Sequence, residues 1–169
     1  MSYYIGVILP EFSEDELERL NGKLDMHLQR EDVLSLLHIL DKGECFYSCF
    51  LSGLGAENGF GSYEFCRTIE ETKNNLRDKP QSFKDFFFRE VYPLLEERRK
   101  DAEQWVEAIR FFFDCYSMRR MGIVMYWSSN DELESDLANL SFDETGLQKI
   151  DCETIMKFRP DIVHFINRG

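Results

Sequence analysis

The stretch from residue 82 to residue 120 constrains the fold most, because apolar residues recur along it at helical spacing. Two stripes are visible: Phe83, Phe86, Phe87, Val91, Leu94 and Leu95, then Ala102, Trp105, Val106, Ile109, Phe112, Phe113 and Tyr116. A straight helix of this span would be about 57 Å long, whereas a domain of this length is about 40 Å across. We therefore expect a broken helical stretch, 82–118, interrupted at Pro93 or by a new helix capped by Asp101 and Gln104.

Two phenylalanine triplets, 86–88 and 111–113, lie within this stretch. Three consecutive aromatic residues cover more than one face of a helix. The triplets would form a recognition surface only if they were exposed, and their regular spacing favours the core. We expect a central helix that is buried on most sides.

A repeat is the second constraint, since GVILPEFSEDELE at 6–18 returns without a gap as GIVMYWSSNDELE at 122–134. Each copy is typical of a buried strand, a turn and the start of an acidic helix. In the first copy, Ser13 and Glu16 have the spacing of a capping box. If the two strands are parallel, the acidic segments that follow emerge at the same end of the sheet and form one surface. If they are antiparallel the segments separate, and we favour the second, which has Trp127 beside it.

The remaining elements complete a single α+β domain, 1–169. It is mostly helical, with a small sheet (strands near 3–9, 121–127 and 161–166) packed on the helical stretch 82–118. Further helices are expected from Ser13 to Asn21, from Glu31 or Asp32 to Gly43, from Ser62 to Asp78 and from Asp151 to Phe158. The segment 45–51, CFYSCFL, is too short for periodicity to decide between a strand and a helix.

The charge is concentrated in two segments. The chain has 32 acidic and 20 basic residues, a net charge of -12. Residues 1–32 carry a net -5 and residues 130–154 a net -7, while the rest cancels. A solvated face that only keeps the protein soluble is the alternative, but such a face usually mixes both signs. Together with Trp127, which lies next to the second segment, these charges predict a binding surface for a basic protein partner. Its candidate residues are Glu14, Asp15, Glu18, Trp127, Asp131, Glu132, Glu134 and Asp136.

Motifs for catalysis, cofactors and metals are missing from the sequence. The loop GLGAENGFG has neither the lysine of a phosphate-binding loop nor the dinucleotide-binding spacing of glycines. Cys45 and Cys49 do not have zinc-ligand spacing, and the three histidines are isolated. We therefore expect no enzyme activity, no cofactor and no metal. An enzyme with an unrecognised site near the glycine-rich loop stays open as an alternative.

The chain has the features of a cytoplasmic protein. We expect no signal peptide, because residues 1–12 lack a basic start and their apolar run is too short, and no apolar run reaches the roughly 18 residues of a membrane helix. Five cysteines, an odd number, are scattered through apolar surroundings and are expected to be reduced thiols. The oligomeric state is not indicated by the sequence.

A small, acidic, cofactor-free domain of this kind resembles the immunity proteins of bacterial polymorphic toxin systems, including contact-dependent growth inhibition. The resemblance covers size, charge and the lack of motifs, so no functional residue is carried over. It implies an inhibitor that binds a basic toxin domain, often a nuclease, and blocks its active site or its substrate surface. The alternative from another class is a DNA mimic that occupies a nucleic-acid-binding protein. Direct contacts with nucleic acid or with an anionic membrane are disfavoured by the charge.

Overall fold

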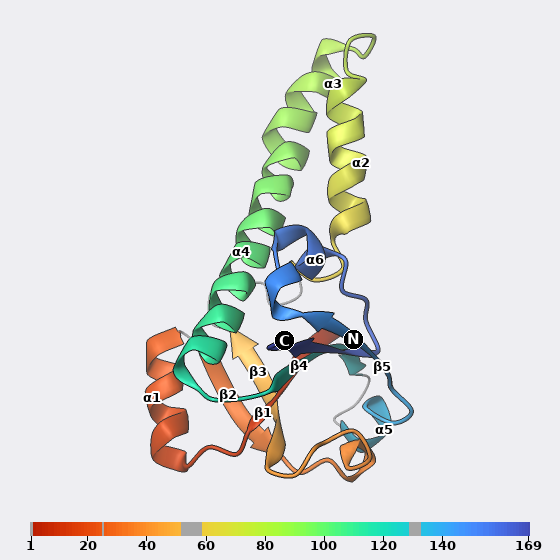
Figure 1. Ribbon diagram of the computed structural model, residues 1–169. Coiled ribbons are helices and arrows are strands. Elements are labelled where there is room, and N and C mark those ends of the chain that lie inside the picture. The colour runs from red at the N-terminus through yellow and green to blue at the C-terminus, as the bar shows by residue number, and fades with distance from the viewer. Residues whose placement is uncertain (1, 25, 52–58, 129–132) are drawn as a thin grey trace.

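A six-stranded mixed sheet forms the centre of the fold, in a computed structural model that describes residues 2–24, 26–51, 59–128 and 133–169 (Figure 1). The strands are β1 (Ser2–Pro10), β2 (Met26–Glu31), β3 (Glu44–Leu51), β4 (Arg120–Ser128), β5 (Ser141–Gly146) and β6 (Ile162–Asn167). Their order is β2-β3-β1-β4-β6-β5, and every neighbouring pair is antiparallel except β5 and β6. The α+β class is thus confirmed, and the three predicted strands are β1, β4 and β6. The sheet is larger than predicted, since β2, β3 and β5 extend it and the undecided segment 45–51 belongs to a strand.

The helices surround this sheet and account for most of the remaining chain. They are α1 (Glu14–Leu24), α2 (Tyr63–Asn74), α3 (Gln81–Phe86), α4 (Tyr92–Cys115), α5 (Leu133–Asp136) and α6 (Cys152–Met156). Three short helical turns complete the set: the 3-10 turns η1 (Leu34–Leu36) and η3 (Leu147–Lys149), and the π-helical turn η2 (Phe87–Val91).

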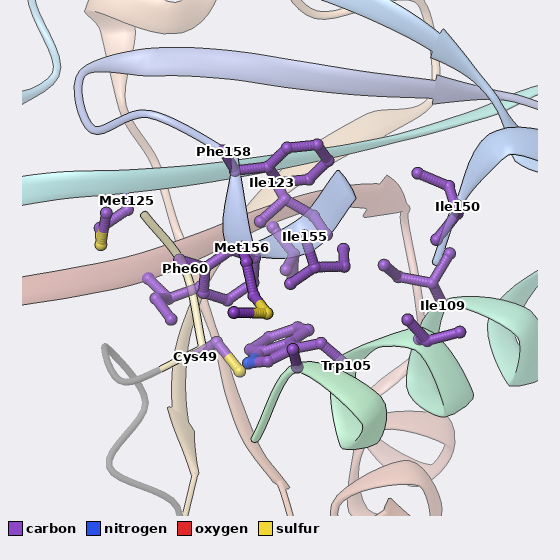
Figure 2. Packing of buried hydrophobic residues seen from close by; sticks show 14 of the residues in the cluster. Cys49, Phe60, Trp105, Ile109, Ile123, Met125, Ile150, Ile155, Met156 and Phe158 are labelled. Atoms are coloured by element: carbon purple, nitrogen blue, oxygen red, sulfur yellow. The ribbon is translucent and has the colours of Figure 1, made fainter. Parts of the chain in front are cut away.

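The two faces of the sheet carry separate cores, because side chains alternate along each strand. The larger core lies between the sheet and helices α1, α4 and α6, where Trp105 and Ile109 of α4 meet Ile123 of β4 and Ile155 of α6 (Figure 2). The smaller core, on the opposite face, packs Ile8, Phe46 and Val124 against Leu36 of η1 and Leu137 after α5. The thin layer formed by η1 and α5 therefore covers one face, and the long helix covers the other.

The stretch 82–118 is helical, as predicted, from Gln81 to Cys115, and it bends at the π-helical turn just before Pro93. No new helix begins at Asp101, which lies inside α4 and is only 9% exposed. The helix can be longer than the body of the domain because it does not lie entirely within that body. Its first half leaves the body together with α2, and the two helices project as an arm, residues 63–103 (Figure 1).

Burial in the first phenylalanine triplet differs from the prediction. Phe87 is buried, but Phe86 and Phe88 are each 48% exposed because the arm that carries them extends away from the sheet. The second triplet packs against the sheet, with Phe112 and Phe113 buried.

The predicted helix from residue 31 or 32 is also wrong. Strand β2 ends at Glu31, and the apolar residues that follow form the turn η1, which lies over the second face of the sheet. Val33, Leu36 and Ile39 enter the smaller core at a spacing that a turn can provide as well as a helix.

Of the helix caps predicted at Ser13, Ser62 and Asp151, two are present. Ser13 Oγ accepts a hydrogen bond from the Glu16 N–H at 3.2 Å, and Asp151 Oδ1 accepts one from the Thr154 N–H at 2.8 Å. Ser62 makes no cap, since its hydroxyl donates to the Gly59 carbonyl oxygen instead. No helix in the described part of the chain is both long enough and apolar enough to cross a membrane.

Candidate functional site

The two repeated strands are antiparallel neighbours, so their acidic continuations do not form one surface. β1 pairs with β4 in a register that places Ile8 opposite Gly122 and Gly6 opposite Val124. The segment after β1 forms α1 on the face of the larger core, whereas the segment after β4 forms α5 on the face of the smaller core (Figure 1). Glu14, Asp15 and Glu18 on α1 are exposed on a different side of the molecule from Glu134 and Asp136.

The acidic start of α1 has a local explanation. Glu14, Asp15 and Glu16 occupy the first turn, where the helix dipole favours negative charge. The Glu16 carboxylate accepts hydrogen bonds from Arg19, 2.6 Å away, and from the Tyr116 hydroxyl. These two bonds, that of Arg19 first, lower the pKa of Glu16. The helix start thus accounts for the acids of the first turn but not for Glu18, and partner binding by Glu14, Asp15 and Glu18 stays a prediction.

Glu134 likewise has a structural role. Its two carboxylate oxygens accept hydrogen bonds from the backbone N–H groups of Leu34 and Ser35, the second at 2.9 Å. Both bonds lower the pKa of Glu134, that from Ser35 first. Glu134 thereby caps η1 across about one hundred residues of sequence and fixes α5 beside it. The contact gives Glu134 a role within the fold, and its predicted part in partner binding stays a prediction.

A groove beside η1 brings exposed leucines next to carboxylates. It has a volume of about 400 Å³ and is lined by Arg30, Glu31, Asp32, Val33, Leu34, Leu37, Leu40, Glu44, Cys45 and Phe46. The side chains of Leu34 and Leu37 are 72% and 63% exposed. Arg30 is already paired, at 2.5 Å with Glu11 and 3.7 Å with Asp32. We call this groove, together with Asp136, the η1 surface.

Tyr126 connects the two sides of the η1 surface. Burial first, and then the neighbouring charges of Glu31 and Asp136, together raise its pKa to about 12. The carboxylate at the end of β2 and the carboxylate at the end of α5 therefore act on one side chain. Tyr4, 38% exposed, stacks on Tyr126 at a ring distance of 6.0 Å. Glu31, at the end of the acidic segment 1–32, and Asp136, in the acidic segment 130–154, thus lie near the same tyrosine.

Trp127 lies on the other face of β4. Tyr126 packs in the smaller core, and the next residue of a strand points to the opposite face. Trp127 is 37% exposed, but it is not on the same face as Asp136 and Tyr126. Asp131 and Glu132, the other two candidates of this segment, lie outside the described residues.

Comparison with known proteins gives no relationship from which a function could be taken. No protein-family model matches the chain, and no curated protein or solved structure is significantly similar to it. The function must therefore be inferred from the charges, exposed side chains and cavities described above.

A second cavity bears on the enzyme alternative. It has a volume of about 330 Å³, between α2, α4 and α6, and two cysteines, Cys66 and Cys152, line it with Glu70, Arg99 and Glu103. Burial raises the pKa of both thiols, the opposite of what a nucleophilic cysteine requires. Among the described residues no three metal-ligating side chains come together. Residues 52–58 of the glycine-rich loop lie outside the described residues.

Several residues of the η1 surface were missed by the analysis of the sequence. Glu31 and Asp32 were assigned to a helix start, and Leu37 to the helix that follows. One signal was available: in EDVLSLLHIL, apolar residues occupy more positions than one side of a helix can bury, so some had to be exposed.

Proposed function

We propose that this protein is an acidic inhibitor that binds and neutralises a basic protein domain, as immunity proteins of bacterial toxin systems do. One observation carries the proposal: the structure sets the exposed Leu34 and Leu37 beside Glu31 and Asp32 and close to α5, whose flanking sequence has no basic residue. Residues 121–148 contain six carboxylates and neither lysine nor arginine. A surface of this kind attracts a basic partner and offers apolar side chains for it to cover.

The proposed mechanism separates attraction from attachment. Carboxylates at the rim act over long range and raise the association rate of a basic partner. Leu34 and Leu37 lose water only in the final complex, so they act mainly on the dissociation rate. The toxin domain would then be covered at its basic active site or substrate surface. The candidates Asp131 and Glu132 extend this sequence of acids and stay predictions.

The test begins with a defined partner, the product of the gene immediately upstream in the native genome. We expect this product to be basic, to bind the inhibitor and to lose its toxicity when both are produced together. In the charge variant Asp32→Lys/Asp136→Lys we expect association to slow and to depend less on salt. In the anchor variant Leu34→Ser/Leu37→Ser we expect faster dissociation, measured by surface plasmon resonance.

A matched control variant is available on α1. Glu14→Lys/Glu18→Lys makes the same change in charge on the opposite face, so it should retain most of the association rate and all of the protection. Equal effects from the α1 and η1 variants would show that only total charge matters and would refute the proposed surface. Competition by duplex DNA at several unrelated basic proteins would favour the DNA-mimic alternative instead.

A further inference from the structure

The projecting arm exposes a row of phenylalanines far from the η1 surface. Phe65 is 42% exposed, Phe83 38% and Phe86 48%. Phe65 comes from α2 and the other two from α3, so the row involves both helices of the arm. Large apolar side chains gathered on one element of a soluble protein indicate a surface that another molecule covers.

A groove runs between the two helices at this row. Its volume is about 280 Å³, and it is lined by Phe65, Thr68, Ile69, Thr72, Phe83, Phe86, Phe87 and Val91. On α2 these residues are spaced three and four apart, so they form one side of that helix. A groove lined by one side of a helix and by aromatic rings fits another helix laid along it.

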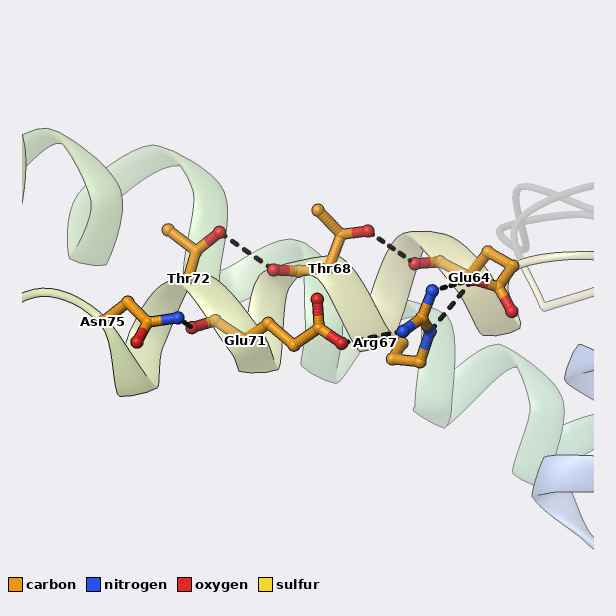
Figure 3. A network of polar contacts seen from close by, with 6 residues as sticks. All are labelled: Glu64, Arg67, Thr68, Glu71, Thr72 and Asn75. Carbon is orange, nitrogen blue, oxygen red and sulfur yellow. Dashed lines mark hydrogen bonds and ion pairs between the residues drawn. The ribbon is translucent and has the colours of Figure 1, made fainter.

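The polar groups at the groove are already satisfied within the arm (Figure 3). The hydroxyl of Thr68 donates to the Glu64 carbonyl oxygen and that of Thr72 to the Thr68 carbonyl oxygen, both at 2.9 Å. Arg67, on the neighbouring side of α2, pairs with Glu64 at 2.6 Å and with Glu71 at 2.7 Å. Because no threonine hydroxyl needs a water partner, covering the groove with an apolar surface costs little desolvation energy.

The charge of the arm changes sign along its length. Lys73 Nζ lies 3.0 Å from the Tyr92 hydroxyl, so residues 73–92 form the outer half of the arm. That half contains five basic and three acidic residues, whereas the inner half, 63–72 and 93–103, contains four basic and seven acidic residues. The outer half is therefore positive by two charges and the inner half negative by three.

We propose that the groove is covered by the arm of a second copy of this chain, laid antiparallel about a two-fold axis. In this arrangement each positive outer half lies on the negative inner half of its partner. Phe83, at the outer end of the groove, meets Phe65 at the inner end of the partner's groove. One patch then serves as both halves of the interface, which is the requirement of a two-fold dimer. The inference does not depend on the proposed function, because the η1 surface lies on the body.

Other occupants fit these observations less well. A parallel arrangement of two arms would set like charges against each other. An anionic lipid surface would attract the outer half but would repel the inner half and the body, since the chain has a net charge of -12. The second copy is the occupant whose charge matches the whole length of the groove.

The first test is sedimentation velocity of the full chain over a range of concentrations. We expect a reversible dimer that Phe86→Ser weakens about tenfold or more, as loss of a central aromatic anchor does. The matched control is Phe142→Ser on β5, also exposed (61%) but outside the arm, and it should leave the dimer unchanged. A wild-type protein that stays monomeric, or a dimer that is indifferent to Phe86→Ser, would overturn the proposal.

The second test reads the orientation and uses only positions that do not line the groove. The outer variant is Lys79→Glu/Lys84→Glu and the inner variant is Glu64→Lys/Glu71→Lys, each checked for folding by circular dichroism. Each variant alone should dimerise more weakly, because both of its contacts become repulsive. Mixed in equal amounts, they should form a heterodimer, identified by native mass spectrometry, since opposite charges then meet at both ends.

Two results would contradict the antiparallel dimer. One, from the second test, is a mixture of the variants that dimerises no better than its components. The other, from a separate flotation assay, is a monomeric wild type that floats with vesicles of phosphatidylserine and phosphatidylcholine, which would make lipid the occupant instead.

Discussion

The substitution Gly6→Ala tests why the repeat begins with glycine. A Cβ atom on Gly6 would lie 2.2 Å from two ring atoms of Phe46, far inside van der Waals contact. Phe46 is 1% exposed and packs against Tyr126 at a ring distance of 6.3 Å, so its ring has no free space to enter. In the second copy, a Cβ on Gly122 would lie 3.0 Å from Ile8 Cβ. Both glycines thus make room for side chains of the smaller core.

The expected cost of Gly6→Ala follows from this contact. Overpacking a well-filled core costs about 1–3 kcal/mol, and we expect the upper half of that range because the ring and its neighbours are buried. In a chain of this length each kcal/mol lowers the melting temperature by about 2–4 °C. The milder contact at Gly122 predicts a smaller loss for Gly122→Ala. The free energy of unfolding should be measured by urea titration, with an unchanged slope.

The control for Gly6→Ala is the same change at Gly22, which has nothing within 4 Å of its Cβ position and lies on α1. There alanine should stabilise the protein by about 0.5–1 kcal/mol through its helix propensity. A smaller ring partner provides the second check: combined with Phe46→Leu, Gly6→Ala should cost at least about 1 kcal/mol less than it does alone. A neutral Gly6→Ala, or strictly additive effects with Phe46→Leu, would refute the packing explanation.

Three further predictions follow from local contacts. Glu134→Gln should destabilise the protein at neutral pH. Because the pKa of Glu134 is lowered in the folded state, the difference in stability between wild type and variant should disappear as the pH falls through that pKa. Urea unfolding midpoints of both proteins at neutral and acidic pH will show this. Asp151→Ala should cost about 1 kcal/mol, read from thermal melting, because it removes the N-cap of α6. Cys49, whose pKa burial raises to about 12, should resist iodoacetamide until the protein unfolds, whereas the exposed Cys115 should react in the native state, as peptide mass spectrometry will resolve.

The sequence predicts three of the four inner strands of the sheet, whereas the segment of the fourth, β3, is too short for periodicity to distinguish a strand from a helix. β1, β4 and β6 have neighbours on both sides and apolar contacts on both faces, so their sequences are continuous apolar runs. β2 and β5 are the two edge strands, with the polar sequences MHLQRE and SFDETG. Their extended form depends on pairing with a neighbour, and no local pattern records that pairing.

The spacing of apolar residues predicts the long helix, but it does not predict which of its side chains are buried by other parts of the chain. The spacing of Phe86, Phe87 and Phe88 identifies a helix whether or not another part of the chain lies over it. Phe112 and Phe113 are buried because the sheet lies beneath them, whereas Phe86 and Phe88 are carried beyond the sheet by the arm. The exposed surface of the arm is therefore a property of the tertiary structure alone.

The sequence showed which segments carry the acidic residues of the candidate surface, but not where in the fold these residues lie. Counting charges identified the segments, but the direction of β4 relative to β1 decided which carboxylates meet. Glu31 and Asp136 were brought to Tyr126 from two segments about one hundred residues apart in sequence. Such a convergence depends on strand order, which a single sequence does not display.

The repeat does have a structural counterpart, although it is confined to the strands. In the pairing of β1 with β4, Val7 lies opposite Ile123, and on either side of this pair Gly6 lies opposite Val124 and Ile8 opposite Gly122. Each glycine of the repeat thus faces the residue two positions after the other glycine, so the pairing is the same seen from either strand. The copies are therefore related by a local two-fold axis perpendicular to the sheet, which keeps both glycines on the same face. The axis does not extend to the helices, because α1 and α5 lie on opposite faces. The repeat therefore specifies a self-complementary strand pair at the centre of the sheet. The acidic segments that follow the two strands differ in structure. α1 covers the larger core, while Glu134 holds α5 beside the exposed leucines of η1.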